Sequence, residues 1–218
     1  MRLFSKKENT PDHYDQIIEC ATKLFVEQTF QETTMQEVAD KASIGIETLY
    51  SYVKTKRDLI FAVAICFWHK EYLIRQELIT YDMTGIEVIV FLMDERIRIF
   101  KEYPSRYIFL EKFDNYVVDH LRNTNNRDIK QKEFLERYSR AVSYDDKFWK
   151  MGLLVGIEDH TIRDDVDLNL TIATLSLIET SVFQKLVNRR VIIDTDEDFN
   201  IDQYTSTIKK VLIEYLNA

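Results

Sequence analysis

The chain has 218 residues, 45% of them hydrophobic, so it is long enough to bury the core of one large or two small domains. Its formal net charge of −8 excludes a generally basic surface, and any contact with a polyanion such as DNA must therefore be local. With only 4 Gly and 2 Pro, the chain is poorly suited to the many turns of an all-β protein.

The predicted elements, in chain order, are helices separated by short polar connections. Thr10, Pro11 and Asp12 are typical of a helix start, because proline at the first turn loses no backbone hydrogen bond. Apolar residues at helical spacing then predict helices over residues 11–29, 34–42, 46–52, 56–78, 86–102, 104–121, 129–160, 168–190 and 201–216. We expect an interruption of the seventh helix near residues 143–146 and an acidic linker over residues 194–202. The fold class is therefore all-α.

The most informative segment, residues 33–59, predicts two short helices joined by a tight turn. Thr34 and Glu37 have the spacing of a capping box, and Thr55 and Asp58 repeat it at the start of a long helix. The second short helix is expected to turn Glu47, Thr48, Tyr50, Ser51 and Tyr52 outward. Such a pair is a helix-turn-helix, whose second helix can enter the major groove of DNA.

This segment resembles the TetR family of bacterial transcriptional regulators. The residues that carry the resemblance are Thr34, Val38, Ala39, Ala42, Ile44, Thr48, Leu49, Tyr50, Lys56 and Leu59. The family's turn glycine is replaced by Ser43, its capping serine by Gly45 and a second glycine by Glu47. Because a non-glycine residue with positive φ costs on the order of 1 kcal/mol, we expect the turn to use Gly45 instead.

The resemblance implies which residues touch DNA. Thr34, Tyr50 and Lys56 are expected to contact the phosphate backbone, Ile46, Glu47, Thr48 and Ser51 to face the bases, and Ser43 and Tyr52 to lie at the edges. Residues 1–60 carry eight Lys or Arg against ten Asp or Glu. The expected basic face is therefore small: Lys54, Lys56 and Arg57, with Arg2, Lys6 and Lys7 on an N-terminal arm. Alternative roles for Tyr50 and Lys56 are a core aromatic and a solvated charge.

The last two helices are expected to form a dimer interface. The residues on their small and apolar faces are Leu170, Ala173, Thr174, Leu177, Ile178, Ser181, Val182, Ile208, Val211, Leu212 and Tyr215. Resemblance to the family implies that these faces build a four-helix bundle between two copies. Two reading helices would then enter successive major grooves of a palindromic operator, about 34–36 Å apart. The alternative is that both helices only close the core of their own subunit.

The central helices are rich in aromatic residues and resemble the family's small-molecule sensor. The candidate pocket residues are Phe91, Met93, Phe100, Tyr107, Phe109, Phe113, Tyr116, Phe148, Trp149 and Met151. An ordinary packed core is the alternative for each of them. Asp94, Glu95, Arg96 and Arg98 are interpreted as a solvated helix face.

Enzymatic and metal-binding functions find little support in the sequence. The four histidines are dispersed, and no phosphate-binding loop or nucleophile elbow occurs. We therefore expect no cofactor, and we expect Cys20 and Cys66 to be buried free thiols rather than a disulfide. The segments around residues 59–68 and 86–93 are too short to span a membrane, which favours the cytoplasm.

The sequence thus predicts a homodimeric repressor with a DNA-binding domain at residues 1–58 and a ligand-binding and dimerisation domain at residues 59–218. Its partners would be double-stranded DNA and a small apolar or amphipathic effector. One alternative is a DNA-binding factor whose solid core takes no ligand. Another is a helical interaction module or enzyme that has lost DNA binding.

Overall fold

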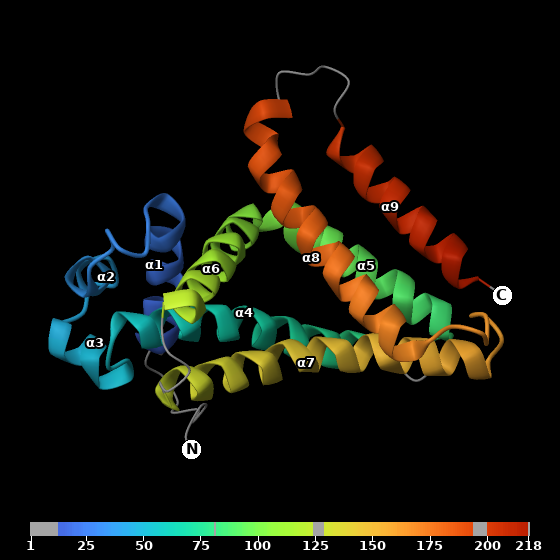
Figure 1. The fold of residues 1–218 in the computed structure, drawn as a ribbon, viewed down its shortest axis with the longest axis horizontal. Helices are drawn as coiled ribbons and strands as arrows, with labels where there is room; N and C mark the ends of the chain where they lie inside the picture. Colours follow the sequence, from blue (N-terminus) through green and yellow to red (C-terminus); the bar gives the residue numbers. More distant parts are fainter. Residues whose placement is uncertain (1–12, 81, 124–128, 194–199, 218) are drawn as a thin grey trace. The chain divides into compact units, whose positions relative to one another are not determined.

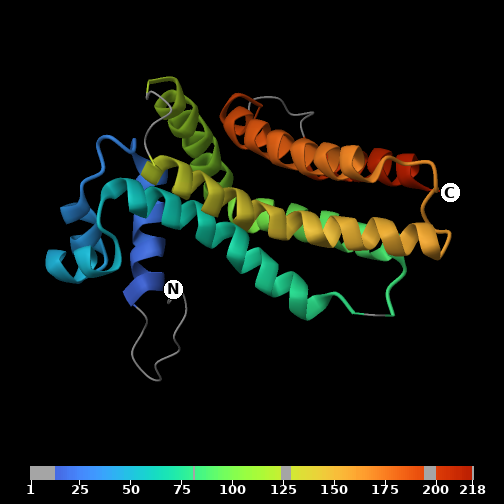
Figure 2. The same ribbon diagram turned by 60° about the horizontal axis from the view of Figure 1, so that its bottom comes forward.

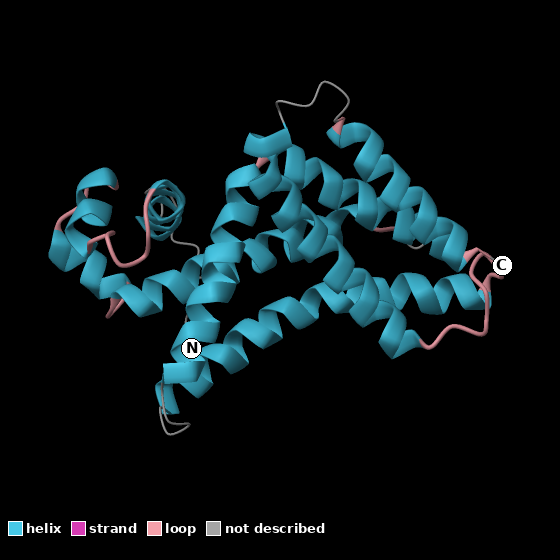
Figure 3. Ribbon diagram, turned by 45° about the horizontal axis from the view of Figure 1, so that its top comes forward, coloured by secondary structure: helices cyan, strands magenta, loops and turns pink. Residues whose placement is uncertain are grey.

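The computed structural model describes residues 13–80, 82–123, 129–193 and 200–217. Every regular element in these ranges is a helix (Figure 3), which confirms the all-α class. The helices are α1 (His13–Glu27), α2 (Met35–Lys41), α3 (Ile46–Tyr52), α4 (Lys56–Leu78), α5 (Gly85–Glu102), α6 (Pro104–Asn123), α7 (Ile129–Glu158), α8 (Leu168–Ile193) and α9 (Ile201–Leu216). The predicted helix start at Pro11 and the N-terminal arm lie outside the described residues.

The predicted interruption of α7 is wrong. The helix runs without a break from Ile129 to Glu158. At the expected break the Ser143 hydroxyl donates to the Arg140 carbonyl at 2.8 Å, so this polar side chain is satisfied inside the helix.

The chain divides into two compact units, one through Val63 and one from Ala64 onward, with the division inside α4. The first unit packs α2 against both α1 and α3. Its core consists of Ile17, Ile18, Ala21, Phe25, Phe30, Val38, Ala39, Ala42, Leu49, Val53, Leu59, Ile60, Phe61 and Val63. The predicted domain boundary at residues 58 and 59 stays a prediction.

In the second unit, α5 and α7 lie side by side (Figures 1 and 2). Glycines permit this close approach, because a Cβ added at Gly85 would lie 1.9 Å from the backbone nitrogen of Gly156. The α5 N-terminus is also fixed by Asp159, which accepts a hydrogen bond from the Gly85 N–H at 2.8 Å. No side chain larger than hydrogen fits at Gly85 without displacing α7.

Two hydrophobic clusters fill the second unit. The larger joins α5 and α7 with residues of α8 and α9, around the fully buried Ile89, Leu92 and Trp149. The smaller joins α5, α6 and α8 around Phe100, Tyr107 and Phe183. Nine of the 18 residues of α5 are buried, among them Glu95 and Arg96, so the buried face differs from the predicted apolar stripe.

Helix α8 contains the stretch Leu168–Val187, whose length and mean hydropathy of 1.3 would suffice to cross a membrane, and 39% of this stretch is buried inside the structure. Because α8 also carries buried core residues such as Leu175 and Phe183, it serves as a packing helix of the second unit.

Candidate nucleic-acid interface

The turn between α2 and α3 is a Schellman motif with serine in the left-handed position. The Ile44 N–H donates to the Ala39 carbonyl and the Ser43 N–H to the Asp40 carbonyl, both at 3.0 Å. Ser43 has a φ of 53°, whereas Gly45 has an ordinary φ of −66° and caps α3 without a side-chain hydrogen bond. The expectation that the turn uses Gly45 is therefore wrong, because the residue with the positive φ is Ser43, which precedes Gly45 in the turn.

A capping box fixes the start of α2, as the spacing predicts. The Thr34 side chain accepts from the Glu37 N–H, and the Glu37 carboxylate accepts from the Thr34 N–H at 2.7 Å. These hydrogen bonds to the Thr34 backbone and hydroxyl hold the pKa of Glu37 below its usual range. At the start of α4, the Thr55 hydroxyl likewise accepts from the Asp58 N–H at 3.1 Å.

Helix α3 presents a mixed polar and aromatic face to solvent. Leu49 is fully buried, whereas Tyr50 is 43% exposed and Tyr52 is 41% exposed. Of the other predicted contact residues, Thr34, Ser43, Glu47 and Ser51 are exposed and Ile46, Thr48 and Lys56 are half-buried. The exposure of Tyr50 argues against the core reading, since its ring and hydroxyl can both reach a partner.

Lys56 has a structural contact that the sequence did not reveal. Its ammonium donates to the carbonyls of Gln31 at 2.9 Å and Thr33 at 2.8 Å. The side chain thereby ties the start of α4 to the loop before α2, and it stands close enough to Glu37 to help lower the pKa of that carboxylate. No spacing rule predicts a bond between residues this far apart in the chain.

The ten predicted pocket residues of the second unit fall into separate packed groups. Phe91, Met93, Phe148, Trp149 and Met151 belong to the larger hydrophobic cluster. Phe100 and Tyr107 pack on Phe183 of α8, with ring centroids 4.8 and 5.4 Å away. Phe109 and Phe113 stack at 6.1 Å, and Tyr116 is half-buried.

A small hollow of about 20 Å³, room for about one water, lies between α5, α8 and α9, and Met93 is the only one of these ten residues in its lining. The lining consists of Met93, Ile97, Glu179, Val182, Phe183, Thr205, Ile208, Lys209 and Leu212. Its walls are therefore largely apolar, with a buried carboxylate among them.

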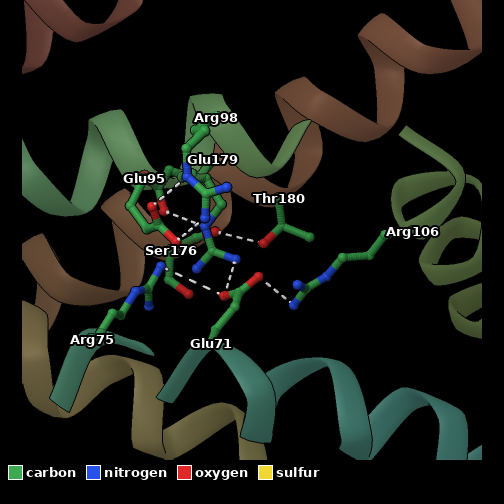
Figure 4. A network of polar contacts seen from close by, with 9 residues as sticks. Glu71, Arg75, Glu95, Arg98, Arg106, Ser176, Glu179 and Thr180 are labelled. Carbon is green, nitrogen blue, oxygen red and sulfur yellow. Dashed lines mark hydrogen bonds and ion pairs between the residues drawn. The ribbon is translucent and has the colours of Figure 1, made fainter. Parts of the chain in front are cut away.

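A buried ionic cluster shares Glu179 with the lining of this hollow, and Figure 4 shows the network of polar contacts in the cluster. Glu71 accepts contacts from three arginines: Arg96 at 2.8 Å, Arg75 at 3.5 Å, and Arg106. Arg96 also contacts Glu179 of α8 at 3.4 Å. The cluster joins α4, α5, α6 and α8, and all five side chains are buried.

The interpretation of Asp94, Glu95, Arg96 and Arg98 as a solvated face is thus wrong for two of them. Arg96 is 3% exposed and Glu95 is 6% exposed. Arg98 and Asp94 do reach solvent, and Arg98 neutralises Glu95 through two hydrogen bonds of 2.9 and 2.7 Å. Helical spacing alone could not show that Arg96 has its partners on α4 and α8.

The predicted dimer residues divide into an exposed set and an inward set. The exposed set is Leu170, Ala173, Thr174, Leu177 and Ser181 on α8 with Val211 and Tyr215 on α9. Ile178 is half-buried, and Val182, Ile208 and Leu212 line the hollow. Leu170 and Leu177 are 66% and 67% exposed, so an apolar stripe faces solvent along α8.

A helix-turn-helix unit followed by a larger helical unit is the organisation of a DNA-binding transcription regulator. Residues 17–63 match the model of the family described as bacterial regulatory proteins, tetR family. The resemblance seen in the sequence is therefore confirmed: the N-terminal unit is a TetR-family DNA-binding domain, and the chain has the fold of a TetR-family transcriptional regulator.

Solved structures extend the likeness over almost the whole chain. The fatty acid degradation regulator FadR from Bacillus halodurans has 13% identity and a TM-score of 0.70, with 94% of this chain and 97% of that chain covered. FadR from Bacillus subtilis, in complex with stearoyl-CoA, has 16% identity and a TM-score of 0.68, covering 94% and 100%. GusR from Salmonella enterica has 15% identity and a TM-score of 0.70, covering 97% and 99%. At these identities the likeness shows the fold. No curated protein sequence matches the chain.

Proposed function

We propose that this protein is a homodimeric repressor that binds a palindromic DNA operator through α3 and is released by a small apolar or amphipathic molecule. The observation that carries the DNA-binding role is the exposed face of α3, held at its start by the turn at Ser43 and at its end by Val53 in the core. Tyr50, Glu47 and Ser51 project from this face.

The first test is selection of fragments from genomic DNA by the purified protein at about 100 mM salt, a concentration at which phosphate contacts still contribute. Recovery of a palindrome with half-sites about 34–36 Å apart is expected for a dimeric reader. Failure to enrich any fragment, even at low salt, would overturn the DNA-binding role.

A substitution on the exposed face of α3 tests whether this face contacts the DNA. Tyr50→Phe keeps the exposed ring and removes the hydroxyl, so we expect operator affinity to fall roughly three- to tenfold, the worth of one hydrogen bond. Tyr103→Phe is the matched control, since Tyr103 is an exposed tyrosine of the second unit. Equal effects of the two substitutions on operator affinity would show that the Tyr50 hydroxyl does not contact DNA.

Dimerisation is proposed through the exposed stripe of α8 and the exposed face of α9. An exposed apolar stripe along a helix is unusual on a monomer and is typical of an interface. Leu177→Arg is expected to give monomers in sedimentation equilibrium. Leu154→Arg should leave the dimer intact, because Leu154 is an exposed leucine on α7. A wild-type chain that sediments as a monomer would refute the dimer.

The effector part of the proposal starts from the hollow between α5, α8 and α9, which has apolar walls but room for only about one water, so an effector would have to widen it on binding. A solved neighbour of the same fold was captured with stearoyl-CoA, which shows that this fold can hold an amphipathic molecule. A regulator of this kind must reach chromosomal DNA, so we propose a cytoplasmic location. We also propose that it has no enzymatic activity.

The second candidate, an interaction module that has lost DNA binding, is favoured by charge pairing in the first unit. Lys23 pairs with Glu19, Lys41 with Glu27, and the Lys56 ammonium is used by backbone carbonyls. These contacts reduce the positive charge offered to phosphates. DNA selection separates the candidates, since this module would enrich no fragment.

A further inference from the structure

Helix α3 has one face in the core and one face in solvent, and Glu47 belongs to the solvent face. Leu49 is fully buried and Val53 is 5% exposed, so these two residues fix the rotation of the helix about its axis. Glu47, Tyr50 and Ser51 are spaced three and four residues apart, which places them on one helical face, and all three are exposed. Glu47 is the one acidic residue of α3, and it lies in the first turn.

The carboxylate of Glu47 differs from most others in the first unit, which accept hydrogen bonds or ion pairs from side chains of the same unit. The engaged carboxylates are Glu19 with Lys23, Glu27 with Lys41, Glu32 with Thr29, Glu37 with Thr34 and Asp40 with Gln36. Within the part of the chain that the structure describes, the Glu47 carboxylate has no such partner. Its oxygens are therefore available to a molecule outside the chain.

The hydroxyl one turn further along the same face is already committed. The Ser51 hydroxyl donates to the Thr48 carbonyl at 2.6 Å, so its proton is used inside the helix. The Tyr52 ring lies 6.3 Å from the Tyr14 ring of α1, so its contact is with the first helix rather than with the face of Glu47. These contacts leave Glu47 as a negative charge that its neighbours on α3 do not neutralise.

The position of Glu47 in α3 is the one that meets base edges in a helix-turn-helix complex. The second helix of this motif lies in the major groove, and its N-terminal residues contact the bases. On docking, the Glu47 carboxylate would exchange water for the groove, and an unpaired charge there is costly. A carboxylate only accepts hydrogen bonds, so it requires a donor on a base.

The major groove offers a suitable donor at one base. Guanine presents two acceptors, and thymine presents an acceptor and a methyl group. Adenine presents an amino donor beside the N7 acceptor, which would repel a carboxylate. Cytosine presents its N4 amino group without a second acceptor of its own, so cytosine is the base that a carboxylate selects.

We infer that Glu47 reads a cytosine in each half-site of the operator by accepting a hydrogen bond from the N4 amino group. The inference rests on the proposed DNA-binding role and specifies one base of the sequence that the protein recognises. Glu47 stands where the family pattern has a second glycine, so this contact is particular to this chain. The same carboxylate disfavours the other bases at that position, because they offer it an acceptor.

A purely structural role for Glu47 makes different predictions. A negative charge in the first turn stabilises a helix through the helix dipole. In that role, Glu47→Gln lowers the stability of the first unit and weakens binding to all DNA sequences alike. Base reading instead changes the preference at one position of each half-site and leaves the other positions as they were.

The test is selection of genomic fragments at about 100 mM salt by the full-length wild type, Glu47→Gln and Glu77→Gln. The wild type is expected to recover a cytosine at one fixed position of each half-site. Glutamine pairs with adenine through two hydrogen bonds, so Glu47→Gln should change that position from cytosine to adenine and no other. Glu77 is exposed in the second unit, so Glu77→Gln removes the same charge and should recover the wild-type site.

Affinity for two synthetic operators measures the contact directly. The second operator has the C·G pair in question replaced by T·A in one half-site. The wild type is expected to bind the second operator at least about fivefold more weakly, the lower end for the loss of one base contact. Glu47→Gln should distinguish the two operators by no more than about twofold, since its amide both donates and accepts.

The outcomes separate this inference from the proposed function. If Glu47→Gln recovers the wild-type site unchanged, or if the wild type binds both operators equally, the inference is overturned and the DNA-binding role stands. If Glu47→Gln alone selects DNA, the carboxylate repels DNA, and the pairing with cytosine is likewise overturned. If no variant selects any fragment, the proposed function itself is refuted, and this inference falls with it.

Discussion

Replacing Ser43 with glycine is expected to stabilise the helix-turn-helix unit. Ser43 has a φ of 53°, in the left-handed region. An L-residue there costs roughly 1–2 kcal/mol, and glycine instead loses about 0.5–1 kcal/mol more conformational entropy on folding. The difference predicts that Ser43→Gly raises the free energy of unfolding by about 0.5–1 kcal/mol.

The two tryptophans allow the effect to be assigned to one unit. Trp68 and Trp149 both lie beyond Val63, so their fluorescence reports on the second unit. Far-ultraviolet circular dichroism reports on helices of both units. If the two units unfold separately in urea, we expect Ser43→Gly to shift only the dichroism transition of the first unit and to leave the fluorescence transition unchanged. If the units unfold together, we expect both signals to shift by the same amount.

Ser43→Ala is the control, because alanine keeps the side-chain carbon and therefore the backbone strain. Its stability should match the wild type within about 0.5 kcal/mol. Equal stability of the glycine and alanine variants, or a loss with glycine, would refute the strain argument. Operator affinity measured on both variants then tests separately whether Ser43 touches DNA, since that role predicts similar losses in both.

Three further predictions concern packing, pH and the Lys56 contacts. Gly85→Ala should destabilise the second unit by about 3 kcal/mol or more in urea unfolding, because its Cβ would meet backbone at 1.9 Å, whereas Gly45→Ala should cost under about 1 kcal/mol. Unfolding measured from about pH 5 to about pH 8 should show stability falling as Glu179 ionises, and Glu179→Gln should remove that fall. Lys56→Met should destabilise the first unit by about 1–3 kcal/mol, while Lys54→Met at an exposed position should change stability little.

The sign of the pH effect follows from the folded state binding the proton more tightly. The pKa of Glu179 rises from 4.5 to about 7 on folding, so its contribution is fully present below about pH 4.5 and is lost as the pH rises through about 7. At about 1.4 kcal/mol per pH unit, the contribution is at most about 3 kcal/mol. If stability falls by the same amount with pH in Glu179→Gln, the fall belongs to other titrating groups. If Gly85→Ala or Lys56→Met has the stability of the wild type, the contact proposed for that residue is contradicted.

The sequence by itself determined the local elements. The Thr34–Glu37 spacing predicted a capping box that the structure contains, and the predicted bounds of the fourth and ninth helices match α4 and α9. These features depend on residues within one or two turns of each other, so their chemistry can be read along the chain. The helix-turn-helix belongs to the same category, because its residues lie within one short segment.

Only the tertiary structure decided what lies behind each helical face. Arg96 and Glu95 look solvated in sequence because charged residues usually are, yet both are buried, and Arg96 has its partners on α4 and α8. The aromatic residues of the second unit likewise packed into separate groups, and the hollow formed elsewhere. Periodicity identifies an inward face, but the charge, shape and empty space opposite that face depend on segments that are distant in the chain.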